Sequence, residues 1–289
     1  MASILTNLFD GVAYGMLLFV LACGLAVTLG LMNFVNLAHG AFAMAGGYIC
    51  AVLVNQSGWP FFAALPLAFV GSALIGIALE RALYRHLYSR SHLDQVLFSI
   101  GLVFMSVAAV DYIMGSSRVF IKLPAALEGQ IDLFGVGIGR YRLMIVVICG
   151  LLTLALQLIL AKTRFGSRLR AAVDDPRAAI GLGINVPQVF AFTFAFGCGL
   201  AGLGGALSAE ILGLDPYFPL KFMIYFLIVV TVGGSSSITG PFLASLLLGI
   251  ADVAGKYYVP KLGPFVIYTV MIVILLWRPN GLFGRTAAR

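Results

Sequence analysis

Apolar residues fall in long blocks along this chain, and short polar or glycine-rich stretches separate the blocks. Blocks of about 17–25 apolar residues are long enough to cross a lipid bilayer as a helix. The pattern therefore predicts an all-α, polytopic membrane protein, a bundle of about eight to ten transmembrane helices. The predicted apolar segments are 11–31, 39–54, 61–80, 95–115, 142–161, 189–213, 222–232, 241–256 and 264–277.

The composition supports a membrane protein. Of the 289 residues, 61% are hydrophobic and 10% are charged, whereas soluble domains carry about 25% charged residues. The net charge of +7 does not indicate a nucleic-acid partner, because the basic residues flank apolar segments. The four cysteines stand inside apolar segments without metal-ligand spacing, so we interpret them as small buried hydrophobes. They are Cys23, Cys50, Cys149 and Cys198.

The distribution of basic residues predicts an orientation. Cytoplasmic loops of membrane proteins are enriched in Lys and Arg. Eleven of the 18 basic residues lie in the 81–94 loop, the 162–188 insert and the C-terminal tail. We therefore predict that these three parts are cytoplasmic and that the N-terminus lies outside. The 116–141 loop then lies outside as well, although it carries three basic residues beside Glu128 and Asp132.

Small residues recur at helical spacing. No hydrophobic force drives helices together in lipid, so small residues that allow close backbone approach carry the packing. One stripe occupies every fourth residue from Gly197 to Ala209, and Gly11 and Gly15 form a second contact. These stripes predict tight helix packing and no particular chemistry.

The sequence offers no catalytic or metal-binding motif. It contains no phosphate-loop pattern, since Gly255-Lys256 is followed by Tyr257, and no H-E-x-x-H, G-x-S-x-G or C-x-x-C. Charged residues inside the membrane usually face a cavity or a partner. Asp111 and Glu210 near the outer ends of their segments are such candidates, but both could reach the membrane surface instead. Asp252 and Lys256 are spaced to pair along one helix.

Two breaks in the apolar pattern are candidates for a translocation path. Residues 30–48 and 231–241 are polar or glycine-rich and adjoin unusually short apolar segments. Short or broken spans in both halves of a transporter mark its binding site, because unwound backbone is tolerated where it lines a cavity. The alternative is that both breaks are ordinary interfacial turns. The candidate path residues are Asn33, Asn36, His39, Gly40, Gly47, Gly233, Gly234, Ser235 and Thr239.

The basic insert at about 163–188 predicts two short helices that form a compact plug. Asp175 is an expected N-cap residue, and proline is favoured at the first position of a helix. Ser167 is expected to start the preceding helix, and the alanines after Pro176 are expected to share one face with Leu182 that enters a groove in a partner. A solvated loop with local helix is the alternative. The candidate coupling residues are Ser167, Arg168, Arg170, Asp174, Asp175, Pro176, Ala178, Ala179 and Leu182.

Five motifs, in order and spread from about Leu5 to Arg285, resemble one family. GLMNFVNLAHGAFAMAGGY is similar to the opening motif of the membrane permeases in branched-chain amino acid ABC importers, and TRFGSRLRAAVDDPRAAIGLGINV is similar to their cytoplasmic coupling segment. GLAGLGGALSA, VGGSSSITGPFLASLLLG and LLWRPNGLFGR follow in the same order. The chain looks closer to the first of the two permeases in such importers than to the second.

The resemblance implies a machine of several subunits. This chain would be one transmembrane permease domain over 1–289, with the coupling segment inside it. It would pair with a second permease, two ATPase subunits and a periplasmic substrate-binding protein in the bacterial inner membrane. ATP and Mg²⁺ would bind in the ATPases, so no cofactor, metal or nucleic acid is expected here, and the N-terminus would be periplasmic. The fold implied is the vitamin B12-importer type.

The expected function is passage of branched-chain or other hydrophobic amino acids along a path that the two permeases share. Relatives in the family import urea, short amides or aromatic acids, so these substrates stay open. A different class, an autonomous secondary transporter or channel, also stays open, with Asp111 or Glu210 as proton carriers. An intramembrane enzyme is a third alternative, which the scarcity of ionisable groups disfavours.

Overall fold

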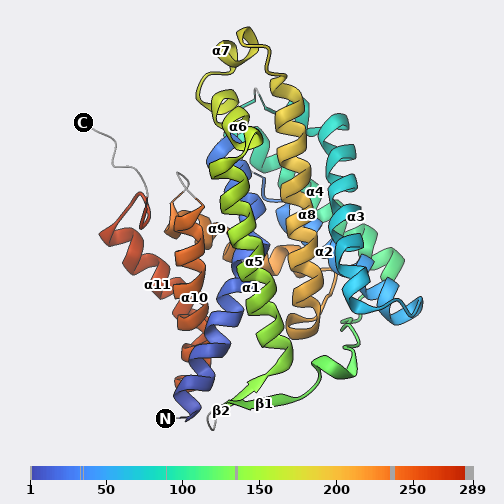
Figure 1. Cartoon of the computed structure of the whole chain (residues 1–289), viewed down its shortest axis with the longest axis vertical. Helices are drawn as coiled ribbons and strands as arrows, with labels where there is room; N and C mark the ends of the chain where they lie inside the picture. Colours follow the sequence, from blue (N-terminus) through green and yellow to red (C-terminus); the bar gives the residue numbers. More distant parts are fainter. Residues whose placement is uncertain are drawn as a thin grey trace.

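A computed structural model describes residues 2–32, 34, 36–88, 90–133, 136–234 and 238–283. Helices make up most of this part of the chain, and α1, α3, α5, α8 and α10 run roughly along the long axis of a bundle (Figure 1). The elements are α1 (Ala2–Met32), α2 (His39–Ala51), the π-helix η1 (Val52–Gln56), α3 (Phe61–Ala82), the 3₁₀ turn η2 (Tyr84–His86), α4 (His92–Met114), the 3₁₀ turn η3 (Ala125–Leu127), β1 (Gln130–Leu133), β2 (Val136–Gly139), α5 (Arg140–Lys162), α6 (Arg164–Asp174), α7 (Pro176–Gly181), α8 (Val186–Leu212), α9 (Phe218–Gly233), α10 (Thr239–Tyr258) and α11 (Gly263–Trp277).

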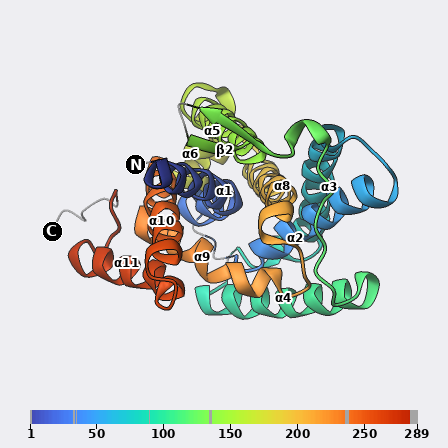
Figure 2. The ribbon, with the colours of Figure 1, turned by 90° about the horizontal axis from the view of Figure 1, so that it is seen from below.

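Two long helices form the centre of the bundle. The apolar spans of α1 and α8 contain 27 residues each, about 40 Å at 1.5 Å per residue. In the most apolar 18-residue stretch of each, 78% and 67% of the residues are buried. The corresponding shares in α3, α4 and α5 are 28%, 17% and 22%, as expected for helices that present one face to lipid. Seen along the axis, α3, α4 and α5 lie at the outside of the bundle, and α2 and α9 lie between α4 and the pair of α1 and α8 (Figure 2). The structure confirms a mostly helical, polytopic membrane architecture.

The central helices pack through small residues, as the stripes predicted. A Cβ atom on Gly205 of α8 would collide with the backbone of Ala43 in α2, and one on Gly197 would lie 3.3 Å from the Cα atom of Gly24 in α1. A Cβ atom on Gly11 would lie 2.7 Å from the Cα atom of Ile250 in α10. Glycine is therefore needed where these backbones cross.

The bundle has two distinct ends. At the N-terminal end, the Ser3 hydroxyl bonds the Tyr257 hydroxyl at 2.9 Å, which joins the start of α1 to the end of α10. The antiparallel β1–β2 hairpin also lies there, with Gln130 opposite Gly139. At the opposite end, α6 and α7 project from the bundle (Figure 1). We call the α6–α7 pair the hairpin, as distinct from the β1–β2 hairpin at the other end, and we call this end of the bundle the hairpin end.

The nine predicted apolar segments correspond to α1, α2 with η1, α3, α4, α5 and α8 to α11. The largest difference is the start of α1, which begins at Ala2 instead of residue 11 and so includes Asp10. The β1–β2 hairpin was not predicted, because its four-residue strands lie in a polar loop without clear alternation. The four cysteines are buried and free.

Candidate functional site

The first break lies inside the bundle, between α1 and α2. Asn36 is fully buried, and its Oδ1 atom accepts hydrogen bonds from the Ala38 backbone N–H at 3.1 Å and the Tyr84 hydroxyl at 3.0 Å. Phe34 packs edge-on against Tyr84 and Tyr88. The side chain of Asn36 therefore replaces a backbone acceptor where the chain leaves helical geometry, and it ties the break to the turn after α3. Asn33 lies outside the described residues.

His39 is the first residue of α2 and joins three helices. It is 1% exposed, and its ring lies against α1 at Gly24, where a Cβ atom would overlap the ring. On its other side the ring meets Phe226 of α9 edge-on, with centroids 6.3 Å apart. Its Nε2 atom has no hydrogen-bond partner among the described residues. His39 therefore does more than begin a helix, because it lies where α1, α2 and α9 meet.

The glycines of α2 face a second interruption, between α8 and α9. A Cβ atom on Gly40 would lie 2.9 Å from the Cα atom of Pro219 at the start of α9, and one on Gly47 would lie 2.7 Å from the Leu214 side chain. Phe218, the first residue of α9, is 1% exposed. Both short helices therefore begin inside the protein and contact each other there. Sequence reasoning missed the 213–217 break, although the α8 segment ends in the turn-forming sequence Gly-Leu-Asp-Pro.

The predicted second break lies elsewhere, at the hairpin end. Gly234 ends α9 with a positive φ of 86°, which favours glycine. The backbone N–H of Phe283 donates to the Gly233 carbonyl at 3.3 Å, so the segment after α11 covers the end of α9. Gly233 lies seven residues beyond Phe226, about 10 Å along the helix. The structure thus separates this glycine pair from His39, and Ser235 lies outside the described residues.

Thr239 lies beside the hairpin. It lines a cavity of about 380 Å³ together with Gly166 and Arg170 of α6 and the end of α5. Arg170 donates to the backbone carbonyl of Leu160, which ties α6 to α5. One residue of the predicted path therefore shares a cavity with the predicted coupling segment, while Asn36, His39, Gly40 and Gly47 gather around the α2 start.

The hairpin has the predicted second helix start. Asp175 caps α7, because its Oδ1 atom accepts from the N–H groups of Arg177 at 2.9 Å and Ala178 at 3.0 Å, and Pro176 is the first helical residue. The predicted start of α6 at Ser167 is wrong. Thr163 caps that helix by accepting from the Gly166 N–H at 3.3 Å, so the helix begins one turn earlier.

The prediction that Ala179 lies on the partner-facing side of α7 is also wrong. Ala179 is 2% exposed and packs against Ala172 of α6 and Val186 of α8. The small side chain lets α7 fold back onto α6, so Ala179 belongs to the core of the hairpin. The apolar residues that face outward are Leu182, which is 79% exposed, and Ile180, which is 60% exposed. The remaining candidate coupling residues are exposed, namely Ser167, Arg168, Arg170, Asp174, Asp175, Pro176 and Ala178.

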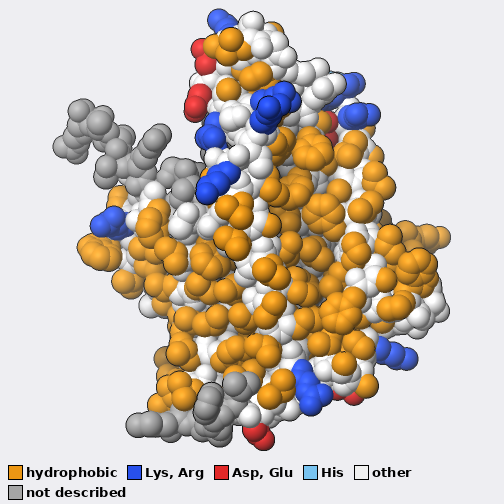
Figure 3. Space-filling model, in the orientation of Figure 1, with side chains coloured by type: hydrophobic (Ala, Val, Ile, Leu, Met, Phe, Trp, Pro, Cys, Tyr) orange, Lys and Arg blue, Asp and Glu red, His pale blue; other side chains and the backbone are white. Residues whose placement is uncertain are grey.

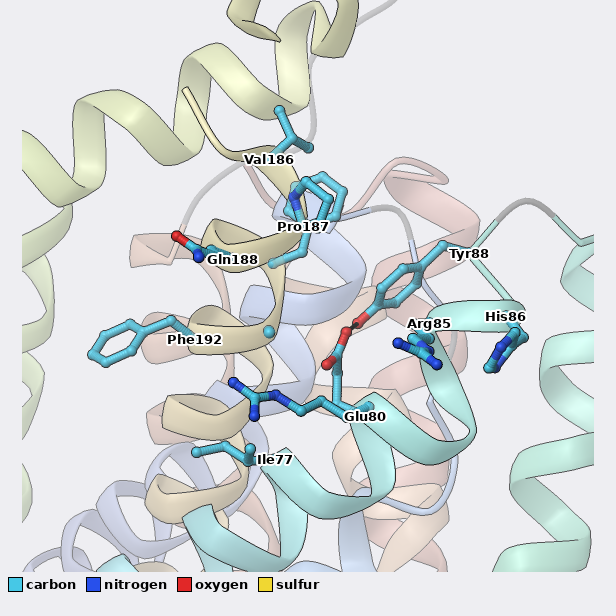
Figure 4. Close-up of a pocket in the computed structure, with 12 residues that line it drawn as sticks. Ile77, Glu80, Arg85, His86, Tyr88, Val186, Pro187, Gln188 and Phe192 are labelled. Atoms are coloured by element: carbon cyan, nitrogen blue, oxygen red, sulfur yellow. Dashed lines mark hydrogen bonds between the residues drawn. The ribbon is translucent and has the colours of Figure 1, made fainter. Parts of the chain in front are cut away.

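A groove of about 750 Å³ lies beside the hairpin, between the end of α3 and the start of α8 (Figure 4). Glu80, which is 4% exposed, accepts a hydrogen bond from the Tyr88 hydroxyl at 3.1 Å. Burial and the Glu80 carboxylate raise the pKa of Tyr88, so the phenol keeps its proton and can donate. Sequence reasoning missed Glu80, although an acidic residue at the end of an apolar helix was a usable signal.

The other charged residues that the sequence singled out at membrane depth are placed as follows. Asp111 is exposed and accepts from the Ser116 hydroxyl at 2.6 Å, and Glu210 is half-buried at the N-terminal end. Lys256 donates to Asp252 at 2.5 Å, which confirms the predicted pair along α10. Within the described ranges, no group of three His, Cys, Asp or Glu side chains could hold a metal ion.

A helical bundle with long apolar spans, interrupted helices that meet inside it and a capped hairpin at one end is the architecture of a polytopic membrane protein. The family model described as "Branched-chain amino acid transport system / permease component" matches residues 7–275, and the chain belongs to this family. The family is therefore the one that the motifs indicated, and the fold is the mostly helical, polytopic membrane architecture that the apolar pattern predicted.

Curated relatives are similar over most of their lengths. The high-affinity branched-chain amino acid transport system permease protein LivH of Escherichia coli (strain K12) is 29% identical, over 97% of this chain and 96% of the relative. BraD of Pseudomonas aeruginosa, with the same system description, is 29% identical over 97% and 96%. LivM of Salmonella typhimurium is 26% identical over 94% of this chain and 68% of the relative. No solved structure matches significantly.

Proposed function

We propose that this chain is the membrane-spanning permease of an ATP-driven importer for branched-chain or similar hydrophobic amino acids. Separate ATPase subunits bind the hairpin, a second permease completes the path, and a periplasmic binding protein delivers substrate at the N-terminal end. The chain itself makes and breaks no bonds. Family membership and the exposed apolar tip of the hairpin support this proposal.

The main support for an ATPase contact is the tip of the hairpin, because this tip has no evident role in this chain alone. Leu182 and Ile180 are exposed on a segment that projects from the bundle. Exposed apolar residues rimmed by charge mark protein interaction sites. Ala172, Ala179 and Val186 form an apolar core that joins α6, α7 and the start of α8. The hairpin can therefore move as a rigid unit when a bound ATPase displaces it.

The charge distribution supports a cytoplasmic hairpin end. Lys and Arg gather around the hairpin, above a belt of apolar side chains that covers the middle of the molecule (Figure 3). Positive residues next to apolar spans stay on the cytoplasmic side. With the hairpin inside, the N-terminus and the β1–β2 hairpin face the periplasm, because they lie at the opposite end.

The meeting of α2 and α9 supports a path at this place. Both helices begin inside the bundle, and interrupted helices of transporters line substrate sites. Asn36 and His39 are uncharged polar groups there, which suits a carrier whose energy comes from ATP and which need not hold a coupling ion. We propose that these residues belong to the moving part of the path, with Gly40 and Gly47 as close contacts.

Copurification tests the proposal. The tagged chain, isolated from its native membrane in mild detergent, should bring ATPase subunits with it. Leu182→Asp should lose them while the chain still inserts, because a largely exposed side chain contributes little to the fold. Leu93→Asp is the matched control, since Leu93 is 67% exposed in the first turn of α4, where an acidic residue is favourable. Full ATPase recovery with Leu182→Asp would refute docking at this tip.

A further inference from the structure

Four charged side chains from three helices gather near the N-terminal end. Asp10 of α1 forms an ion pair with Arg142 of α5, and Asp252 of α10 accepts a hydrogen bond from Lys256 at 2.5 Å. All four line one cavity of about 190 Å³. Ion pairs that only join helices need no cavity between them, so the arrangement calls for another explanation.

Each carboxylate uses only one oxygen for its cation. The Oδ2 atoms of Asp10 and Asp252 carry the ion pairs, whereas their Oδ1 atoms are buried and have no hydrogen-bond partner among the described residues. Asp252 is 1% exposed. Buried acceptors without a donor are rare in native proteins and unfavourable. Asp10 and Asp252 both line the small cavity, and their two unpaired acceptors are suited to a ligand with several N–H groups, of which a primary ammonium has three.

Arg142 and Lys256 have N–H donors that their ion pairs with the aspartates do not use. The side chains of Arg142 and Lys256 are 43% and 50% exposed, so they lie at the open side of the cluster. A guanidinium presents five N–H donors and matches a carboxylate in a two-bond geometry. Each cation can therefore contact a second carboxylate while it keeps its aspartate.

The rest of the cavity is apolar and small. Ile211 of α8 and Val253 of α10 contribute aliphatic walls, and the ring of Tyr14 lies 5.7 Å from the Lys256 ammonium. Pockets for drug-sized ligands measure about 300–1,000 Å³, so this cavity suits a ligand of amino-acid size. Two acidic and two basic groups balance, so a ligand of zero net charge leaves no buried excess charge.

We propose that this cavity binds the zwitterionic head group of an aliphatic amino acid. The ammonium bonds the free Oδ1 atoms of Asp10 and Asp252, the carboxylate contacts Arg142 and Lys256, and the aliphatic side chain meets the apolar wall. The cavity lies at the end opposite the hairpin, where substrate would enter. This inference rests on the proposed function and names the first contact of the permease with its substrate.

Protection of a cysteine tests the site in the assembled complex. The four native cysteines are buried, so Val253→Cys is the reactive thiol of choice in this chain. Its modification by a small thiol reagent is timed with L-leucine, with leucinamide (which keeps only the cation) and with 4-methylpentanoate (which keeps only the anion). L-leucine should slow modification several-fold, neither half-charged analogue should do so, and Asp252→Asn should abolish the protection.

Ser117→Cys, exposed at the same end but outside the cavity, is the control and should react at one rate throughout. Equal rates at Val253→Cys with and without L-leucine, in a complex that transports leucine, would overturn the site and leave the proposed function intact. Protection by all three compounds would overturn recognition of the zwitterion. Absence of ATP-driven transport by the complex would instead contradict the proposed function.

Discussion

The crossing of α2 and α8 depends on Gly205 having no side chain. A Cβ atom there would lie 2.6 Å from the carbonyl carbon of Ala43 and 3.1 Å from its Cα atom, and closer still to its oxygen. These are backbone atoms, so no rotamer change can remove the collision. The Gly205→Ala substitution must push the two helices apart.

The magnitude follows from the geometry. Normal carbon–carbon contact is about 3.5–4.0 Å, so the helices must separate by roughly 1 Å, which forfeits a quarter to a half of the dispersion energy of each contact across the crossing. Overpacking of a core costs about 1–3 kcal/mol of folding free energy. Because the colliding atoms belong to the backbone and cannot move aside, the cost of Gly205→Ala should lie at the upper end, about 3 kcal/mol. The gain in helix propensity, about 1 kcal/mol, offsets only part of this. The melting temperature should fall by several degrees.

Thermal unfolding of the purified chain in detergent measures the effect. The matched control is Gly101→Ala in α4, where a Cβ atom meets no atom within 4 Å. That variant gains helix propensity without a collision, so its melting temperature should stay constant or rise. Equal melting temperatures for Gly205→Ala and Gly101→Ala would refute the packing argument.

Four further outcomes are expected. Asp175→Ala removes the acceptor of two α7 amides and should destabilise the hairpin by about 1 kcal/mol, measured as faster hydrogen exchange in α7. Ala179→Asp buries an unpaired carboxylate, so the hairpin should become protease-sensitive, whereas Leu182→Asp should leave it resistant. Asn36→Leu removes the acceptor of the buried Tyr84 hydroxyl, so transport by the complex should fall while its assembly survives. A cysteine at Ser167 should resist an impermeant reagent added outside intact cells; labelling there would reverse the orientation.

The helices could be predicted from the sequence because bilayer thickness imposes long apolar segments, and Asp175-Pro176 carries its own helix-start signal. The start of α6 was misplaced because Thr163 and Ser167 are both acceptable N-caps, and only the fold decides between them. Likewise, local periodicity does not show that Ala179 turns inward, since that depends on where α8 begins.

The candidate site was predictable in part. Three polar residues in one apolar block marked the α2 start, but Tyr84, the partner of Asn36, and Phe226, the partner of His39, come from distant parts of the chain. The cluster of four charged residues near the N-terminal end was missed for the same reason, because it combines Asp10 of α1 and Arg142 of α5 with Asp252 and Lys256 of α10. Residue spacing reveals pairs on one helix, such as Asp252 and Lys256, and cannot reveal pairs between helices.

Uptake of labelled L-leucine into proteoliposomes distinguishes an ATP-driven importer from an autonomous transporter. The chain is reconstituted with its second permease, ATPases and binding protein, and uptake is measured with ATP, without ATP, and with the chain alone under an imposed ion gradient. Uptake is expected only from the full complex with ATP, and it should be lost with Leu182→Asp. Ion-driven uptake by this chain without ATPases would contradict the account and identify an autonomous transporter.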